Sequence, residues 1–341
     1  MARGKKRVTI VDIAKLCGVS AKTVSRVLNG EPHVTDKIRD QVLATAKELK
    51  YQPNVVAQGL VSRRSYLIGL IYEKPSPSYV VDLQKGALER LHGERYRLIV
   101  LPVESVASDS EAVVKLLQAT AVDGVLLAPP ASDDSLILTE LDELHIPFAR
   151  ISPTRLPEFG PSVAIDDIAA ASEIAEHLIG LGHRRIGIIK GDATHAATEA
   201  RLLGYAQAMA RHGIPLNLDF VESGLFSFES GHDAALRLLK RPVRPTAILA
   251  QNDDMAAGAI AAARSLGIEV PRDLSVAGFD DSDIARVVWP ALTTVRQPVE
   301  AMAHQAMDML LATLAGDAPG PSAVHGHILQ LRQSTAAPAS T

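Results

Sequence analysis

The segment VTIVDIAKLCGVSAKTVSRVLNGEPHVT, residues 8–35, decides the fold of the N-terminal part of the chain. Thr9 and Asp12 have the spacing of a capping box, and apolar residues recur after them at helical intervals. Gly18 predicts a turn, and Ser20 is placed to cap a second helix. The segment therefore predicts two short helices joined by a tight turn, with a polar face on the second helix.

That polar face suits contact with DNA. A helix-turn-helix places its second helix in the major groove, where Lys22 and Arg26 can donate to guanine. A pair of helices with a merely solvated face is the alternative interpretation. Charge favours DNA, because residues 1–65 hold thirteen Lys or Arg against five Asp or Glu, whereas the other 276 residues hold 22 against 34. Side chains suited to phosphate contacts are Ser20, Thr23, Ser25 and Asn29.

A third helix and a short connecting segment are predicted next. Thr35 can cap a helix from Asp36 to about Lys50, which completes a head over residues 1–52. Residues 53–65 follow as a hinge or linker, in which a helix this short is only marginally stable. The side chains expected to close the core from the third helix are Ile38, Val42, Leu43, Ala46 and Leu49, and Cys17 joins them from the first helix.

Residues 66–335 alternate short apolar runs with longer amphipathic stretches. Apolar strands that alternate with helices predict parallel βαβ units with right-handed crossovers. About 270 residues are too many for one such sheet, so we expect two subdomains, with a break after Pro161. Residues 336–341 are interpreted as a disordered tail. The predicted strands lie within 67–72, 97–102, 124–129, 146–151, 185–191, 246–251 and 274–280, and the predicted subdomains span about 66–162 plus 297–320 and about 163–292 plus 321–335.

The predicted strands indicate where a ligand would bind. In an open parallel sheet, ligands bind beyond the carboxyl ends of the strands. Carboxylates and amides there can pair with vicinal hydroxyls, and aromatic faces can cover the apolar side of a sugar ring. The residues that suit this chemistry at or near those ends are Glu73, Tyr79, Ser152, His195, Arg201, Phe226, Asn252 and Asp280. The alternatives are that Asn252 and Asp280 cap the next helix and that Arg201 forms a surface ion pair.

Residues 8–35, followed by ELKYQPNVVAQGL at 48–60, resemble the DNA-binding head and hinge of the LacI/GalR family of bacterial repressors. The resemblance implies base-reading roles for Ala21, Lys22 and Arg26 in the major groove. It also implies a hinge helix that orders on operator DNA and wedges a leucine between base steps in the minor groove. The expected DNA contacts are Thr9, Ser20, Ala21, Lys22, Thr23, Ser25, Arg26, Asn29, Asn54, Ala57 and Leu60.

The rest of the chain, as far as about residue 335, is similar to the effector region of the same family. The implied fold is an N-terminal all-α helix-turn-helix head plus an α/β effector region of two parallel-sheet subdomains, like periplasmic sugar-binding proteins. Arg201 matches the family arginine that anchors ligand, and Asn252 and Asp280 match the pair that binds sugar hydroxyls. Phe226 lies at a position where members of the family often have a stacking aromatic residue. Gln297 lies in a strand that crosses between the subdomains.

The resemblance also guides the choice of ligand. His195 stands where purine-binding members carry an arginine, and Ser152 where others carry an aspartate, which favours a sugar or sugar derivative. We therefore expect a ligand-responsive repressor that binds a pseudo-palindromic operator as a homodimer. The alternatives are a regulator that depends on a purine co-repressor, and a sugar-binding protein or enzyme that does not bind DNA.

Signals for other classes of protein are missing from the sequence. It has no Gly-x-Ser-x-Gly elbow, Walker loop, HExxH or CxxC pair, so we expect no enzymatic activity and no cofactor. No second cluster accompanies the acidic residues at 280–283, and we expect no metal. The absence of a long apolar run and of a signal peptide predicts a cytoplasmic protein without a membrane partner. Without leucine heptads in the tail, a dimer is expected rather than a tetramer.

Overall fold

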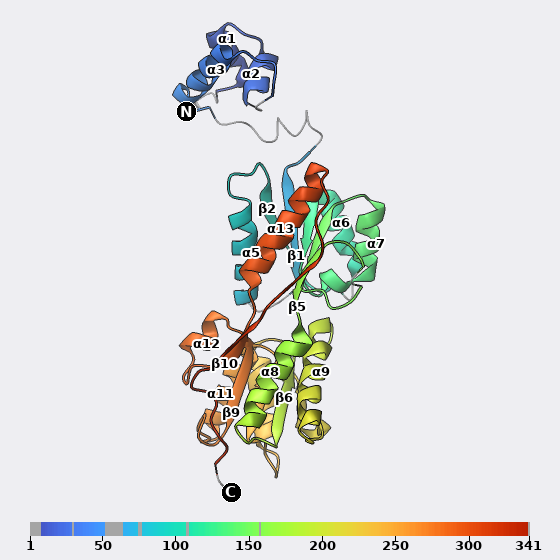
Figure 1. The fold of residues 1–341 in the computed structure, drawn as a ribbon, viewed down its shortest axis with the longest axis vertical. Helices are drawn as coiled ribbons and strands as arrows, with labels where there is room; N and C mark the ends of the chain where they lie inside the picture. The colour runs from blue at the N-terminus through green and yellow to red at the C-terminus, as the bar shows by residue number, and fades with distance from the viewer. Residues whose placement is uncertain are drawn as a thin grey trace, which may run out of the picture. The chain divides into compact units, whose positions relative to one another are not determined.

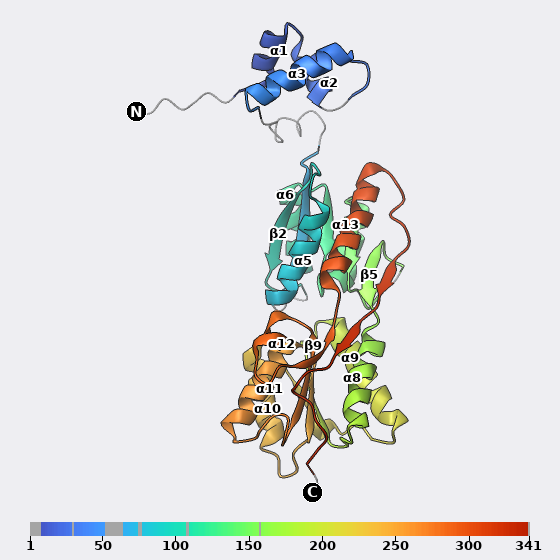
Figure 2. The same cartoon turned by 60° about the vertical axis from the view of Figure 1, so that its left-hand side comes forward.

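The computed structural model describes residues 8–28, 31–51, 64–73, 77–106, 109–156 and 158–339. The chain divides into two compact units between Ser65 and Tyr66. We call them the head and the body, and Figure 1 and Figure 2 show the elements of each.

The described residues of the head form a bundle of three short helices: α1 (Ile10–Cys17), α2 (Ala21–Leu28) and α3 (Asp36–Glu48). Asp12 Oδ2 accepts a hydrogen bond from the Thr9 amide at 2.8 Å at the start of α1. Gly18 ends α1 with φ of +65°, a conformation that glycine adopts without steric cost. The Ser20 hydroxyl accepts from the Thr23 amide at 3.0 Å, as expected of the residue that caps α2. These observations confirm the predicted helix-turn-helix.

The structure confirms the predicted core residues of the head, with the exception of Leu43. Val42 and Ala46 of α3 are buried, and they lie on one face because they are four residues apart. Leu43 is rotated by about 100° from Val42 around the helix axis, and its side chain is 46% exposed. The expectation that Leu43 belongs to the core was therefore wrong. Cys17 is buried in this core, as predicted.

In the described part of the body, the strands form two six-stranded sheets. The first has the strand order β11-β5-β4-β3-β1-β2 and the second has the order β12-β10-β9-β8-β6-β7. Among the described strands, neighbours pair in parallel except for β10 with β12. The strands are β1 (Leu67–Glu73), β2 (Arg97–Val103), β3 (Gly124–Leu127), β4 (Phe148–Ile151), β5 (Ser162–Ile165), β6 (Ile186–Lys190), β7 (Val221–Ser223), β8 (Ala247–Ala250), β9 (Ser275–Asp280), β10 (Thr293–Arg296), β11 (Ala323–His325) and β12 (Ile328–Gln330). All seven apolar runs predicted as strands form strands.

Helices pack beside both sheets (Figure 1, Figure 2). The first sheet is accompanied by α5 (Pro77–Arg90), α6 (Ser110–Thr120), α7 (Ser135–Glu143) and α13 (Val299–Ala315). The second is accompanied by α8 (Asp167–Gly180), α9 (Ala196–Arg211), α10 (Phe228–Leu239), α11 (Asp253–Ser265) and the short α12 (Asp283–Val287). Two 3₁₀ turns, Ala131–Asp133 and Leu218–Phe220, lie in connections. Large apolar clusters fill the space between helices and sheets.

The division into two subdomains differs from the prediction. β5 pairs with β4, and β11 pairs with β5, so both strands belong to the first sheet. The sequence predicts residues 163–165 and 321–335 in the second subdomain, and for both of these strands that prediction is wrong. An apolar run identifies a strand but does not tell which sheet that strand joins, and the break after Pro161 is a turn within one sheet. The chain crosses between the subdomains after β5, after β10 and between β11 and β12.

The start of the predicted tail is held in place. The Ala336 amide donates to Ser275 Oγ at 3.0 Å, and the Ala336 carbonyl oxygen lies 2.9 Å from His183 Nε2. The expectation of disorder from residue 336 onward was therefore wrong at its first residue. His183 is 1% exposed and connects the tail to the second subdomain.

Candidate functional site

A cavity of about 60 Å³ lies between the two subdomains of the body. Strands of both parallel sheets end beside it, which is where the architecture favours a ligand. Eight of the nine predicted ligand residues line it, and Glu73 is the exception. The lining residues are Tyr79, Pro129, Ser152, Asp167, His195, Ala197, Arg201, Phe226, Asn252, Asp280 and Gln297.

Arg201 is fixed at the base of this cavity and is 6% exposed. Its Nε donates to Asp167 Oδ1 at 2.8 Å, and its Nη1 donates to the Gln251 carbonyl oxygen at 2.6 Å. The guanidinium also lies over the ring of Phe279, 3.7 Å from the ring centre, and Asp280 Oδ1 lies 3.9 Å from Nη1. Arg201 is therefore a buried, preorganised donor rather than a surface ion pair.

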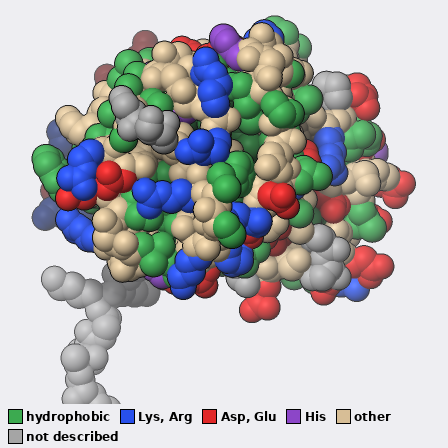
Figure 3. Space-filling view, turned by 90° about the horizontal axis from the view of Figure 1, so that it is seen from below, with side chains coloured by type: hydrophobic (Ala, Val, Ile, Leu, Met, Phe, Trp, Pro, Cys, Tyr) green, Lys and Arg blue, Asp and Glu red, His purple; other side chains and the backbone are tan. Residues whose placement is uncertain are grey.

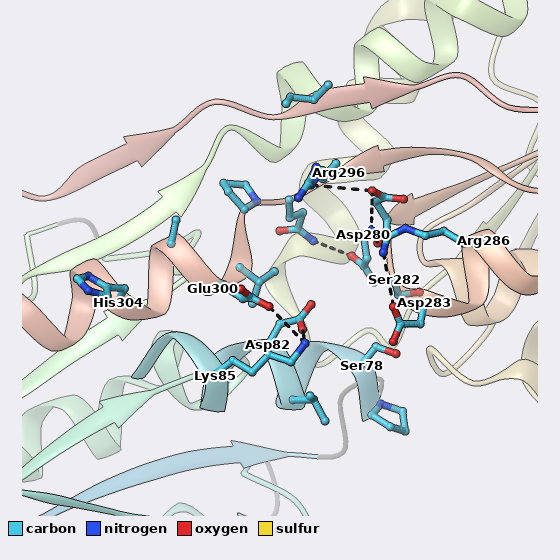
Figure 4. A pocket seen from close by; sticks show the side chains of 18 of the residues that line it. Ser78, Asp82, Lys85, Asp280, Ser282, Asp283, Arg286, Arg296, Glu300 and His304 are labelled. Atoms are coloured by element: carbon cyan, nitrogen blue, oxygen red, sulfur yellow. Dashed lines mark hydrogen bonds and ion pairs between the residues drawn. The ribbon is translucent and has the colours of Figure 1, made fainter. Parts of the chain in front are cut away.

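Asp280 is the acceptor that faces Arg201. Its Oδ1 accepts a hydrogen bond from Gln297 Nε2 at 2.7 Å, and Figure 4 labels Asp280 among the residues that line an adjoining groove. Burial raises the pKa of Asp280 to about 7, although Arg201 and the bond from Gln297 favour the ionised form. Asp280 does not cap the next helix, because α12 begins after Ser282. The Asp280 carboxyl is thus free to accept a ligand hydroxyl when ionised.

Asn252 has two roles. Its Oδ1 accepts from the Met255 amide at 2.9 Å, so it caps α11, as the alternative interpretation proposed. Its Nδ2 donates to the Phe226 carbonyl oxygen at 2.9 Å, which holds the aromatic residue at the cavity. The Phe226 ring occupies space beside Gly191, where a Cβ atom would lie 2.0 Å from it. His195 meets the same ring edge-on at 5.2 Å, and burial lowers the His195 pKa, so the imidazole is neutral.

The first subdomain contributes two hydroxyl groups. Tyr79 Oη and Ser152 Oγ lie 3.3 Å apart, and burial raises the pKa of Tyr79 to about 12, so the phenol keeps its proton. Ser152, Phe226 and Asp280 all have positive φ angles, of 48°, 58° and 120°. Strained backbone of this kind is concentrated at ligand sites, where surrounding contacts must hold it. The strain here therefore supports a binding role for the cavity.

Glu73 does not join the other predicted residues. Its Oε2 accepts from the Val106 amide at 2.6 Å, and the side chain is buried away from the cavity lining. Sequence reasoning missed Pro129, Asp167 and Ala197. Asp167 follows the strand β5 and could have been found by the rule that identified the others, but its position at the start of α8 also suited a purely helical role.

The cavity adjoins an open groove of about 820 Å³, which shares Asp280 and Gln297 with it. On one wall Lys85 pairs with two carboxylates of α5 and α13, at 2.9 and 3.3 Å. On the other wall Arg286 of α12 pairs with Asp281 at 3.3 Å (Figure 4). Among the described residues of the groove, no ion pair joins the two walls. A change of the angle between the subdomains would therefore break no ion pair between these described residues.

The head presents the predicted DNA-reading side chains on and around α2. Lys22 is exposed, and Arg26 forms an exposed ion pair with Glu31 at 3.6 Å, which is a weak interaction. Ala21, Thr23 and Ser25 are partly exposed on the same helix, and Ser20 and Thr9 are exposed at the helix starts. The other predicted DNA contacts, Asn29, Asn54, Ala57 and Leu60, and the rest of the hinge as far as residue 63, lie outside the described residues.

Known protein families match both the head and the body of this chain. The family described as "Bacterial regulatory proteins, lacI family" matches the sequence of residues 9–54. The family described as "Periplasmic binding protein-like domain" matches residues 175–335. The HTH-type transcriptional regulator DegA of Bacillus subtilis (strain 168) is 37% identical over 298 residues, which cover 87% of this chain and 88% of DegA. The chain belongs to the LacI family.

Solved structures extend this similarity to almost the whole chain. A lac repressor dimer bound to operator and the anti-inducer ONPF is 30% identical with a TM-score of 0.85, over 97% of this chain and 100% of that one. A transcriptional regulator CelR–cellobiose complex is 30% identical with a TM-score of 0.73, over 96% and 100%. This LacI-family chain is thus a transcriptional regulator with a DNA-binding helix-turn-helix and a body like periplasmic binding proteins, and not an enzyme.

Within the described residues, no helix combines the length and apolar character needed to cross a bilayer. In the same part of the chain, no three His, Cys, Asp or Glu side chains gather closely enough to hold a metal ion.

Proposed function

We propose that this LacI-family repressor binds a pseudo-palindromic operator as a homodimer, and that a neutral sugar or sugar derivative in the body cavity controls its DNA affinity. The observation that carries the proposal is the convergence of a buried guanidinium, a carboxyl that is only 12% exposed and an aromatic ring on one cavity, from Arg201, Asp280 and Phe226. The protein acts on DNA in the cytoplasm.

The charges of the cavity favour an uncharged ligand. Arg201 is already compensated by Asp167 at 2.8 Å, and Asp280 supplies a second carboxyl. His195 is kept neutral because burial lowers its pKa. An anionic sugar would therefore find no uncompensated positive charge among the lining residues, whereas hydroxyl groups could donate to Asp280 and accept from Arg201. A planar purine could pack against His195 and Phe226, and it remains the second candidate.

Binding requires the subdomains to change their relative angle. A cavity of about 60 Å³ is much smaller than typical ligand sites, which enclose roughly 300–1,000 Å³. The three chain crossings between the subdomains can act as hinges, and the groove walls are not joined by an ion pair among the described residues. A ligand that prefers one angle then shifts the population toward it, and a coupling of roughly 1–3 kcal/mol changes affinity severalfold to a hundredfold.

Exposed apolar side chains support the dimer. Val81 and Leu88 of α5 are 48% and 53% exposed, and Val287 and Trp289, at the end of α12 and just after it, are 79% and 73% exposed. Clusters of exposed apolar residues are typical of protein–protein interfaces. Because α5 and α12 line opposite walls of the groove, a dimer formed through both would respond to the subdomain angle. The angle would then set the spacing of the two heads on the operator.

The experiment is a ligand screen followed by a DNA titration with the full chain. Thermal shift is measured with neutral sugars, sugar phosphates, uronic acids and purines, and the operator is selected from a random duplex library. We expect a neutral sugar to raise the melting temperature and to change the dissociation constant for the selected duplex. Stabilisation by a sugar phosphate or a purine alone, or a stabilising sugar that leaves DNA affinity unchanged, would contradict the proposal.

A further inference from the structure

A second groove lies at the end of the second subdomain opposite the cavity. It has a volume of about 570 Å³ and begins at the residues just before β6, whereas the cavity lies beyond the carboxyl ends of the strands. Its other walls come from the end of α9, the 3₁₀ turn Leu218–Phe220 and the loop after α10. Figure 3 looks onto this end of the molecule and shows Lys and Arg side chains spread over much of the face.

The groove is lined by three arginines, Arg184, Arg185 and Arg241, against one acidic residue, Asp219. Neither Arg184 nor Arg185 forms an ion pair with any described residue. Within the described part of the chain, the Arg185 side chain makes one long hydrogen bond, from Nε to the Arg244 carbonyl oxygen at 3.4 Å. This concentration of positive charge is unusual, because residues 66–341 as a whole carry 34 acidic against 22 basic residues.

Arg241 adds an unsatisfied donor. Its Nη2 is fixed by Glu222 at 3.0 Å, but its Nε is buried and has no hydrogen-bond partner among the described residues. An acidic group in this groove would meet the exposed side chains of Arg184 and Arg185, together with Arg241, whose Nη2 already pairs with Glu222.

The floor of the groove is apolar. Ile186, Met209 and Ile214 are buried beneath it, and Val243 stands at its edge with 59% of its surface exposed. The side chain of Leu218, in the adjoining turn, is 74% exposed. A DNA backbone offers regular phosphates and no apolar side chains, so it would use the arginines and leave this floor uncovered. A peptide that carries carboxylates beside an apolar residue fits both parts.

We propose that this groove binds an acidic peptide segment of a partner protein. The carboxylates of the segment pair with Arg185 and Arg241, and an apolar side chain packs against Ile214 and Val243. Because the groove and the cavity lie at opposite ends of the second sheet, the partner would attach without occupying the effector site. The inference does not depend on the identity of the effector.

The test uses the full-length chain as bait for a random dodecapeptide phage library. Enriched sequences are synthesised with a fluorescent label, and their dissociation constants are measured by anisotropy. We expect the enriched peptides to hold more Asp and Glu than Lys and Arg and to contain an apolar residue. An Arg185→Glu variant should bind them at least tenfold more weakly, and a Val243→Asp variant should also weaken binding. The matched control is Arg95→Glu, an exposed arginine of the first subdomain, which should leave binding unchanged.

Several outcomes would overturn the proposal. One is that the selection yields no acidic peptides, and another is that Arg185→Glu binds them as tightly as the unaltered chain. A third is that unrelated duplex DNA displaces the peptide when its phosphates are present at the same concentration as the peptide's carboxylates. The urea midpoint of each variant, measured in parallel, distinguishes a lost contact from a lost fold. If Arg185→Glu fails to fold, the Val243→Asp result decides alone.

Discussion

Replacing Asp280 with asparagine separates the stability of the cavity from its function. The Asp280 side chain is 12% exposed, and burial raises its pKa to about 7. Asparagine keeps an oxygen that can accept a hydrogen bond from Gln297 Nε2. It also removes the ionisable group. The substitution should therefore stabilise the protein without ligand and impair ligand binding.

The size of the stabilisation follows from the pKa shift. An ordinary aspartate has a pKa of about 3.9, so the raised value makes the ionised group costly to bury, by roughly 1.4 kcal/mol per unit. A raised folded-state pKa means that stability is fully present below pH 3.9 and is lost as the pH rises through about 7. Neutral asparagine keeps that stability. The gain for Asp280→Asn is then about 2 kcal/mol at pH 5.5 and at most about 4 kcal/mol at pH 8.

The assay is urea unfolding of the full chain and of Asp280→Asn at pH 5.5, 7 and 8, with the head transition followed separately from that of the body. The reasoning predicts that the gain of the variant grows with pH and levels off above pH 7. A gain that is independent of pH, or a loss of stability at pH 8, would refute the claim that a buried ionised carboxyl destabilises this site. The same variant should lose at least tenfold in affinity for the effector.

Three other substitutions test separate parts of the structure. Arg201→Lys keeps the charge but cannot reproduce the two hydrogen bonds of the guanidinium. Calorimetry should therefore show effector binding weakened at least tenfold, with unchanged affinity for operator DNA. Effector affinity equal to that of the unaltered chain would show that Arg201 does not bind the effector. Gly191→Ala should displace the Phe226 ring, lower the free energy of unfolding by about 1–3 kcal/mol and weaken effector binding. A urea midpoint equal to that of the unaltered chain would show that the Phe226 ring is not held against Gly191. Trp289→Asp should shift sedimentation toward monomer at micromolar concentration, and an unaltered dimer would place the interface elsewhere.

Local patterns predicted the elements of this protein well. The capping spacing at Thr9 and the turn at Gly18 specified the helix-turn-helix, because both act within a few residues. The apolar runs of the body specified its strands for the same reason. Leu43 was misplaced because an apolar residue at the edge of a helical stripe can face either way. The strand at 162–165 was assigned to the wrong subdomain because sheet membership depends on contacts between distant segments.

The cavity was largely predictable because parallel sheets bring strand ends together. Arg201 and Asp280 were found by that rule, and the structure brings them within 3.9 Å. Glu73 also satisfied this rule, but its carboxylate accepts a hydrogen bond from the Val106 amide instead of lining the cavity. That contact depends on the conformation of a loop, which no local sequence pattern encodes. The double role of Asn252, as helix cap and as anchor of Phe226, likewise depends on tertiary contacts.

The central claim is that the head binds operator DNA with an affinity that the body controls through a ligand. The most direct measurement is an anisotropy titration of the selected operator with the full chain, with and without the sugar found in the screen, and again with Asp280→Asn. We predict that saturating sugar changes the dissociation constant of the unaltered chain fivefold or more, and that this change is lost in the variant. An operator affinity that does not respond to the sugar, or that responds equally in the variant, would contradict the account.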